Sequence, residues 1–322
     1  MISSPLTWIP RPVADEALAQ LRRHGDVALG YGPGAVDFRS VSARTTGVLL
    51  RTAEFRRRDI DLAPNLCIIA RHGAGYDTVD VDAATERGIP VTTTGAANAG
   101  AVAEHVFALL FAVARNVTTA DRAVRDGRWV SARGALTGLE LGGRTMGLLG
   151  GGRIGRRVAA IASALGMTVV VSDPALSAED AEALGVQVLG HDELLAASDV
   201  LSLHLPLTRD TEKIIDRSAL YALPAGAILI NTARGGLVDE HALRKCLDDG
   251  QIVGAGLDVL ACEPPADGNP LLAHPRTVLS PHIAGQTDAA LRRVALEAAA
   301  AILATYRGET PAGAINGVVV GG

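Results

Sequence analysis

Short aliphatic and β-branched runs alternate with longer Ala-rich stretches along most of the chain. In the first third, the runs that predict strands are 27–29, 47–50, 67–70 and 90–92, with helical stretches at 15–24 and 80–87 between them. A second series of predicted strands follows at 145–149, 168–172, 200–203, 227–230, 253–257 and 277–279. Alternation of this kind is typical of βαβ units. The continuous apolar runs indicate parallel strands that are buried on both faces.

Two long apolar stretches flank the second series of strands. They predict helices at about 100–115, with Asn98 as a cap, and at about 287–306, with Thr287 or Asp288 as the cap and Gly308 at the end. A length of 322 residues suggests two domains. We therefore predict an α/β protein with two doubly wound parallel sheets. Residues 1–98 and 288–322 form one discontinuous domain, residues 99–287 form the other, and the helices cross between them beside a cleft.

A glycine-rich segment, GGGRIG at residues 150–155, stands between the predicted strand 145–149 and a helical stretch at 156–165. Gly150, Gly152 and Gly155 satisfy the G-x-G-x-x-G pattern. The first glycine permits a tight turn, the second lets the backbone approach a pyrophosphate, and the third allows close helix–strand packing. Glycine triplets also occur in ordinary turns, but strand, loop and helix in this order favour a dinucleotide site. A P-loop is a poor alternative because Arg156 and Arg157 stand where Lys-Ser/Thr is required.

The predicted strand 168–172 ends in Asp173. A carboxylate at this position accepts hydrogen bonds from the ribose hydroxyls of NAD, and it repels the 2′-phosphate of NADP. Pro174 and Ala175 follow, and neither supplies a compensating cation. The pattern therefore predicts NAD as the cofactor.

The composition and charge indicate which kinds of partner the protein does not bind. Nearly half of the residues are apolar and a fifth are charged, which is ordinary for a globular protein. The net charge of −5 argues against a nucleic-acid binder. The most apolar stretches, 101–114 and 294–304, are shorter than the roughly 20 residues that span a bilayer. We expect neither a nucleic acid nor a membrane as a partner.

Cys67, Cys246 and Cys262 are far apart and form no C-x-x-C, so we expect neither a disulfide framework nor a metal site. A reducing cytosol is the simplest compartment for such a chain. Residues 1–12 lack the apolar core of a signal peptide. We therefore expect a cytoplasmic protein.

Three charged residues follow predicted strands of the second series. The strand at 227–230 leads to Arg234, the strand at 253–257 leads through Asp258 to Glu263, and the strand at 277–279 leads to His282. Open α/β sheets bind their ligands at the carboxyl ends of the strands. The three side chains are therefore candidates for one active site.

Taken in order, these segments resemble the D-isomer-specific 2-hydroxyacid dehydrogenase family, and within it the phosphoglycerate dehydrogenase-like branch. The resemblance covers nearly the whole chain. The matching segments are RHGAGYDTVD (71–80), NAGAVAEH (98–105), GGGRIG (150–155), DP (173–174), HLPLT (204–208), NTARGGLVD (231–239), GLDVLACE (256–263) and SPHIAGQT (280–287). The resemblance implies an NAD-dependent oxidoreductase that acts on the CH–OH group of 2-hydroxy acids. It also implies a Rossmann NAD-binding domain inserted in a flavodoxin-like substrate domain.

The Arg/Glu/His set of the family corresponds by motif to Arg234, Glu263 and His282. Reduction of a 2-oxo acid adds a hydride to the carbonyl carbon and a proton to its oxygen, so His282 would be the general acid and, in reverse, the base. Glu263 would accept the other ring N–H and favour the imidazolium. Arg234 would hold the substrate carboxylate.

The resemblance assigns substrate contacts to Arg51, Ala74, Gly75 and Asn98, in addition to Arg234 and His282. Arg51 also fits a solvated cationic face, because three arginines follow at 56–58, and Asn98 also fits a helix cap. Beyond the glycine loop and Asp173, the resemblance assigns cofactor contacts, many of them through the backbone, to Arg153, Ile154, Leu205, Thr211, Thr232, Ala233, Asp258, Ala284 and Gly285.

The residues leave the substrate open among phosphoglycerate, glycerate or hydroxypyruvate, glyoxylate and other small 2-oxo acids. The resemblance also implies a homodimer formed through the nucleotide-binding domain. A second hypothesis is an NAD-binding interaction protein of the corepressor type that has no turnover. The complete Arg/Glu/His set argues against it, because a sensor needs no acid–base pair.

Overall fold

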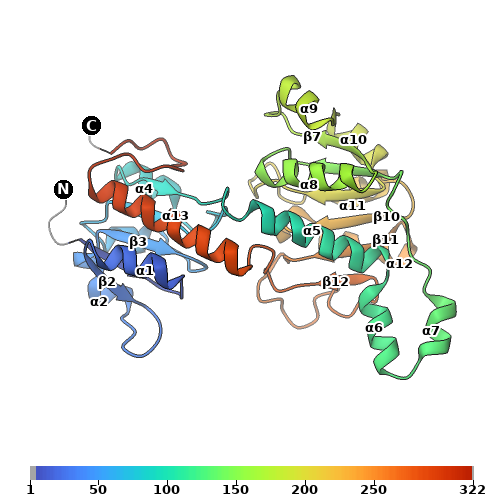
Figure 1. The fold of residues 1–322 in the computed structure, drawn as a ribbon, viewed down its shortest axis with the longest axis horizontal. Coiled ribbons are helices and arrows are strands. Elements are labelled where there is room, and N and C mark those ends of the chain that lie inside the picture. Colours follow the sequence, from blue (N-terminus) through green and yellow to red (C-terminus); the bar gives the residue numbers. More distant parts are fainter. Residues whose placement is uncertain (1–4, 321–322) are drawn as a thin grey trace. The chain divides into compact units, whose positions relative to one another are not determined.

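The computed structural model describes residues 5–320 (Figure 1). Four residues of the N-terminal stretch 1–12 and the last two residues of the segment 288–322, both discussed above, lie outside the described part. The chain divides into two compact units. Unit 1 comprises Met1–Asn98 and Gly285–Gly322, and unit 2 comprises Ala99–Ala284.

In the described part of unit 1, five parallel strands lie in the order β2-β1-β3-β4-β5. The strands are β1 (Leu6–Ile9), β2 (Asp26–Leu29), β3 (Gly47–Leu50), β4 (Ile68–Arg71) and β5 (Val91–Thr92). The helices are α1 (Asp15–Arg22), α2 (Phe38–Val41), α3 (Arg57–Asp61), α4 (Val81–Glu86) and α13 (Asp288–Tyr306), with a short 3-10 helix η1 (Ser42–Arg44). One apolar cluster joins α1 and α13 to the sheet, and a second contains side chains of α2, α3 and α4. This strand order is that of a flavodoxin-like sheet.

In unit 2, which is described throughout, seven parallel strands lie in the order β12-β11-β10-β9-β6-β7-β8. They are β6 (Thr145–Leu149), β7 (Thr168–Ser172), β8 (Gln187–Val188), β9 (Val200–Leu203), β10 (Ala227–Asn231), β11 (Ile252–Leu257) and β12 (Thr277–Leu279). The chain departs from β6 in both directions, so the order reverses between β6 and β9. Ligands of doubly wound folds bind beyond the carboxyl ends of the strands at such a reversal.

Helices cover both faces of the sheet in unit 2. The helices are α5 (Ala99–Ala114), α6 (Val117–Arg125), α7 (Trp129–Ala135), α8 (Arg153–Ala164), α9 (Ala178–Leu184), α10 (His191–Ala197), α11 (Arg217–Ala222) and α12 (Glu240–Asp249), with a 3-10 helix η2 (Gly235–Leu237). One apolar cluster contains α5 and α8, and the other contains α10, α11 and α12. The helices α6 and α7 project away from the sheet (Figure 1).

The predicted α/β class with two doubly wound parallel sheets is confirmed. The sequence pattern missed the short strands β1 and β8. It also placed the start of α8 at residue 156, whereas the helix begins at Arg153. The glycine run lowers helix propensity, but Gly155 is already helical because it packs against the preceding turn.

Among residues 5–320, no single helix has the length and apolar composition needed to cross a membrane. Helices α5 and α6 meet those criteria only when they are taken together, and they are bent by 59° relative to each other.

Candidate active site

The glycine loop of residues 150–152 joins the carboxyl end of β6 to the first turn of α8. Gly150 has a φ of 109°, which a side chain would disfavour. A Cβ on Gly155 would collide with the carbonyl oxygen of Gly150, whereas a Cβ on Gly152 would have no atom within 4 Å. The third glycine therefore serves packing, and the second leaves open space at the N-terminus of α8. This combination fits a bound pyrophosphate.

Asp173 follows β7, and its carboxylate reaches the glycine loop. Its Oδ2 atom accepts a 2.7 Å hydrogen bond from the amide of Gly151, and its Oδ1 atom accepts a 2.8 Å bond from the amide of Ala175. A carboxylate has about four lone-pair positions, so capacity for ribose hydroxyls remains. The nearby Arg156 guanidinium donates to Gly151 O and pairs with Asp180 at 2.6 Å.

Arg234 lies in the turn that follows β10. The side chain of Asn231 fixes this turn, because its Nδ2 donates to Arg234 O at 2.8 Å and its Oδ1 accepts from Ala233 N at 3.0 Å. The next residue, Gly235, packs so closely on the backbone of Leu260 that a Cβ would overlap it. The Arg234 turn therefore lies directly against the loop that leads to Glu263.

Glu263 and His282 form a direct pair. His282 Nδ1 lies 2.7 Å from Glu263 Oε2, and both side chains are partly exposed. Glu263 Oε1 also accepts a 3.2 Å bond from the amide of Leu260.

Each member of this pair changes the pKa of the other. The hydrogen bond and the charge of Glu263 raise the pKa of His282 above its ordinary value, against the opposing effects of burial and Arg234. Burial alone would raise the pKa of Glu263, but the hydrogen bond and charge of His282, the Leu260 amide and Arg234 outweigh it and lower the pKa. The pair therefore favours an ionised carboxylate beside an imidazolium.

Asp258 lies directly after β11 and is only 1% exposed. Its Oδ1 atom accepts hydrogen bonds from Ser280 Oγ at 2.6 Å and from Ile283 N at 2.9 Å, and its Oδ2 atom accepts from Ala284 N at 2.8 Å. The backbone oxygen of Asp258 accepts from His282 N. Asp258 and Ala284, which the family resemblance assigns to the cofactor, therefore also have a structural role: the bond between them helps to fix the loop that carries His282.

The other residues of unit 2 with assigned cofactor contacts lie in three places. Arg153 and Ile154 form the first turn of α8. Leu205 and Thr211 belong to the loop after β9, where Thr211 Oγ1 donates to Pro206 O at 2.7 Å. Thr232 and Ala233 follow β10, and the buried Thr232 Oγ1 has no hydrogen-bond partner among the described residues. A buried hydroxyl of this kind is suited to a polar group of a bound cofactor.

The remaining assigned residues lie in unit 1. Arg51 follows β3, and its guanidinium donates to Pro12 O at 3.1 Å and to Gln286 Oε1 at 3.4 Å. Ala74 and Gly75 lie in the loop after β4, where Arg71 Nε donates to Gly75 O at 2.8 Å. Asn98 lies beside Gly285, and its Oδ1 atom is buried without a hydrogen-bond partner in the described chain. The substrate roles of these residues stay predictions.

Sequence reasoning missed the residues that hold the site in place. Asn231, Ser280 and His105 all belong to the matched motifs. Asn231 holds its own turn through Arg234 O, whereas the contact between His105 and Ser280 joins segments far apart in the chain. No group of three or more His, Cys, Asp or Glu side chains within residues 5–320 could hold a metal ion.

Comparison with known proteins identifies relatives over the whole chain. The family model described as "D-isomer specific 2-hydroxyacid dehydrogenase, NAD binding domain" matches residues 107–284. A glyoxylate reductase of Aeropyrum pernix is 39% identical over 326 residues, covering 98% of this chain and 97% of the relative. A chloroplastic D-3-phosphoglycerate dehydrogenase of Arabidopsis thaliana is 37% identical over 321 residues, which are 99% of this chain but 51% of the relative. The chain thus spans about half the length of that relative.

Solved structures show the same architecture. An NADPH-dependent glyoxylate/hydroxypyruvate reductase of Sinorhizobium meliloti, in complex with NADP and malonate, has a TM-score of 0.87 and 30% identity, covering 99% of each chain. Together with the family match, this likeness supports the two-sheet fold as that of an established group of oxidoreductases.

Proposed function

The chain belongs to the D-isomer-specific 2-hydroxyacid dehydrogenase family, and we propose that it is an NAD-dependent dehydrogenase that interconverts a small 2-oxo acid and its D-2-hydroxy acid. One observation carries the proposal: the 2.7 Å bond between His282 Nδ1 and Glu263 Oε2, with Arg234 close enough to act on the pKa of both.

The pair determines which ring nitrogen exchanges the proton. An ionised carboxylate can only accept, so the Nδ1 atom of His282 keeps its hydrogen and donates it to Glu263. The proton for the substrate therefore comes from Nε2. In reduction, Nε2 gives its proton to the carbonyl oxygen, and neutral His282 remains. In oxidation, neutral His282 takes the hydroxyl proton.

Arg234 acts on charge and orientation. Its planar guanidinium can hold the substrate carboxylate through two parallel hydrogen bonds, which fixes the carbonyl beside His282. Its positive charge also lowers the pKa of His282, which promotes release of the proton to the substrate. The bound nicotinamide supplies the hydride.

We propose NAD rather than NADP as the cofactor. Asp173 lies against the glycine loop through Gly151, where its charge would repel a 2′-phosphate. Arg156, a cation near Asp173, is paired with Asp180. The Sinorhizobium meliloti relative is named as NADPH-dependent, so a direct comparison of the two cofactors is required.

For the substrate, we propose a compact 2-oxo acid of the glyoxylate, hydroxypyruvate or phosphohydroxypyruvate type. These classes correspond to the names of the glyoxylate reductase and phosphoglycerate dehydrogenase relatives. Backbone amides of Ala74 and Gly75, together with Arg51 and Asn98, are the proposed further substrate contacts.

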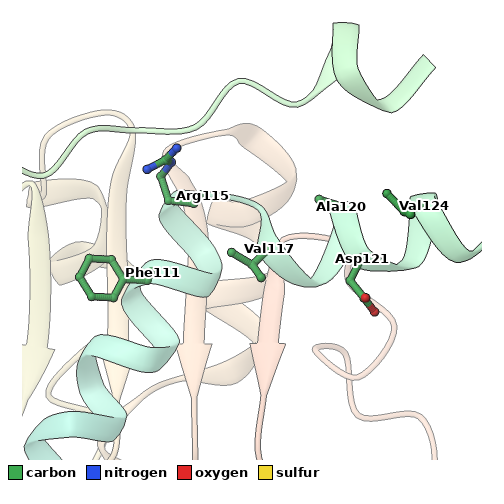
Figure 2. Close-up of a pocket in the computed structure, with 6 residues that line it drawn as sticks. All are labelled: Phe111, Arg115, Val117, Ala120, Asp121 and Val124. Carbon is green, nitrogen blue, oxygen red and sulfur yellow. The ribbon is translucent and has the colours of Figure 1, made fainter. Parts of the chain in front are cut away.

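We also propose that the protein is a homodimer that pairs through an arm formed by α6 and α7. The apolar side chains of this arm and of the adjoining end of α5 are exposed, with Trp129 62% and Val130 85% exposed. Phe111 on α5 and Val117 and Val124 on α6 are among the residues that line a surface hollow of about 630 Å³ (Figure 2). We propose a second copy of the chain as the partner that covers these exposed apolar residues, since an exposed apolar patch marks an interaction site and most oligomers are homo-oligomers.

The test is oxidation of NADH and NADPH with glyoxylate, hydroxypyruvate, phosphohydroxypyruvate and branched 2-oxo acids. We expect NADH turnover with at least one compact acid. We also expect His282→Ala to lose about 10²–10⁴-fold in kcat while it binds NADH with nearly unchanged affinity. NADH binding without turnover on any acid would favour the corepressor-type hypothesis, and a clear preference for NADPH would contradict the role of Asp173.

A further inference from the structure

The loop that carries His282 is held at both ends by one buried carboxylate. His282 has a φ of 55°, in the left-handed region that non-glycine residues seldom adopt. Such a conformation persists only where the surroundings enforce it. Asp258 binds Ser280 two residues before His282, and Ile283 and Ala284 directly after it. The position of the imidazole therefore depends on where the Asp258 carboxylate lies.

Ser280 also contacts a helix that is far from it in the sequence. Its hydroxyl hydrogen points to Asp258 Oδ1 at 2.6 Å, so the oxygen of the hydroxyl can only accept from other groups. His105 Nε2 lies 2.9 Å from Ser280 Oγ and 3.4 Å from Asp258 Oδ1. His105 must therefore carry its hydrogen on Nε2 and donate it to the serine. The helix that bears His105, α5, packs against β10, β11 and β12, so this donor has a rigid support.

We propose that His105 and Ser280 are positioning residues for His282, linked to it by a chain of hydrogen bonds from His105 Nε2 through Ser280 Oγ to the Asp258 carboxylate. The proposal rests on the acid–base role of His282 proposed above. His105 acts through Ser280 and Asp258, and it makes no assigned contact with substrate or cofactor.

The link acts on both geometry and charge. Three charged groups act on His282: Glu263 and Asp258 raise its pKa, and Arg234 lowers it. If the Ser280 hydroxyl loses the hydrogen bond from His105, it can rotate away from Asp258. The loop then loses the hydrogen bond that holds it to the Asp258 carboxylate before His282. His282 then moves relative to Glu263. The hydrogen bond between His282 and Glu263 is then lost, and with it the largest cause of the raised pKa of His282.

The experiment compares three substitutions of His105 in the full chain. His105→Gln places an amide N–H near the position of Nε2, His105→Asn places one near Nδ1, and His105→Leu provides no donor. Ser280→Ala breaks the link at the loop, so it tests the same chain of bonds without changing α5. Two quantities are measured: the pH dependence of kcat and kcat/KM for 2-oxo acid reduction, and the pKa of His282 from NMR of imidazole-labelled protein.

We expect the Leu, Asn and Ser280→Ala variants to lower the pKa of His282, move the alkaline limb of reduction to lower pH, and lower kcat about tenfold or more, because a misplacement of about 1 Å can cost about 10²-fold. The Gln variant should retain most of the wild-type pKa and rate. In a double-mutant cycle, the Leu and Ser280→Ala effects should not add.

A purely structural role for His105 gives another pattern: all three His105 variants lower the melting temperature and the rate, and the pKa of His282 stays unchanged. That result overturns the proposal, as does a Leu variant indistinguishable from wild type. The NMR titration needs no turnover. If the wild-type protein reduces no 2-oxo acid, the proposed function fails, while the pKa of His282 in the variants still tests the hydrogen-bond chain.

Discussion

His282 combines an unfavourable backbone conformation with a stabilised charge. The left-handed φ costs about 1–2 kcal/mol for a residue other than glycine. The hydrogen bonds of the loop to Asp258 offset this cost. This conformation places His282 Nδ1 2.7 Å from Glu263 Oε2. The motif SPH marked His282 as a candidate acid–base residue, but the sequence indicated neither its φ nor its distance to Glu263.

The first prediction concerns the pH profile. Because Glu263 raises the pKa of His282, the acid form of His282 persists to higher pH, and reduction should decline only above that raised pKa. Glu263→Gln keeps the shape but removes the charge, so the pKa of His282 should fall. The alkaline limb of kcat/KM for reduction should then move to lower pH. Oxidation, which needs neutral His282, should extend to lower pH.

Glu309→Gln is the matched control, because Glu309 is an exposed carboxylate paired with Arg307 in unit 1. It should leave both profiles unchanged. A Glu263→Gln profile that overlays the wild-type curve would show that another group sets the observed ionisation.

At the scale of an element, the strand–loop–helix unit of β6 and α8 separates the roles of its glycines. Gly155 is helical and lies against Gly150, while Gly152 precedes the helix and faces open space. The sequence motif predicted both roles. The low helix propensity of glycine indicates a later helix start, whereas Gly155 packs tightly on Gly150 and the helix begins at Arg153.

The second prediction separates packing from binding. Gly155→Ala should lower the melting temperature of the protein without cofactor by several degrees, because overpacking costs about 1–3 kcal/mol. Gly152→Ala should leave that temperature nearly unchanged but weaken NADH binding, measured by fluorescence titration. Equal melting temperatures together with equal NADH affinities in the two variants would contradict this division of roles.

At the scale of the whole molecule, the arm formed by α6 and α7 is a feature that the sequence pattern did not predict. Of the two tryptophans, Trp8 is buried in the core of unit 1 and Trp129 is exposed on the arm. In the described α6 and α7, Ala123 is the one buried residue. A pair of helices with so little intramolecular burial gains stability by covering its apolar side chains with another surface.

The third prediction is the oligomeric state. Wild-type protein should have the mass of a dimer by sedimentation or light scattering at micromolar concentration. The double substitution Trp129→Ser with Val130→Asp should shift that mass to a monomer, because it puts a charge into the proposed apolar interface. Val319→Asp places the same charge at a 70% exposed valine of unit 1 and should remain dimeric. A monomeric wild type, or a dimeric arm variant, would refute the interface.

The sequence by itself determined the α/β class, the glycine loop, its acidic partner and the three motif residues Arg234, Glu263 and His282. These features are local, because each depends on the periodicity or spacing of residues close together in the chain. Only the tertiary structure decided that the Asp173 carboxylate reaches the amide of Gly151. It also decided that one carboxylate, Asp258, binds both flanks of His282.

The contact of His105 with Ser280 joins residues 175 positions apart, and no pattern of short period can encode such a pair. The parallel sheet brings them together, because β11 and β12 end beside each other and α5 packs across them. The sequence therefore identified the candidate residues for the chemistry. Their distances and the supports that hold them follow from strand order and helix packing.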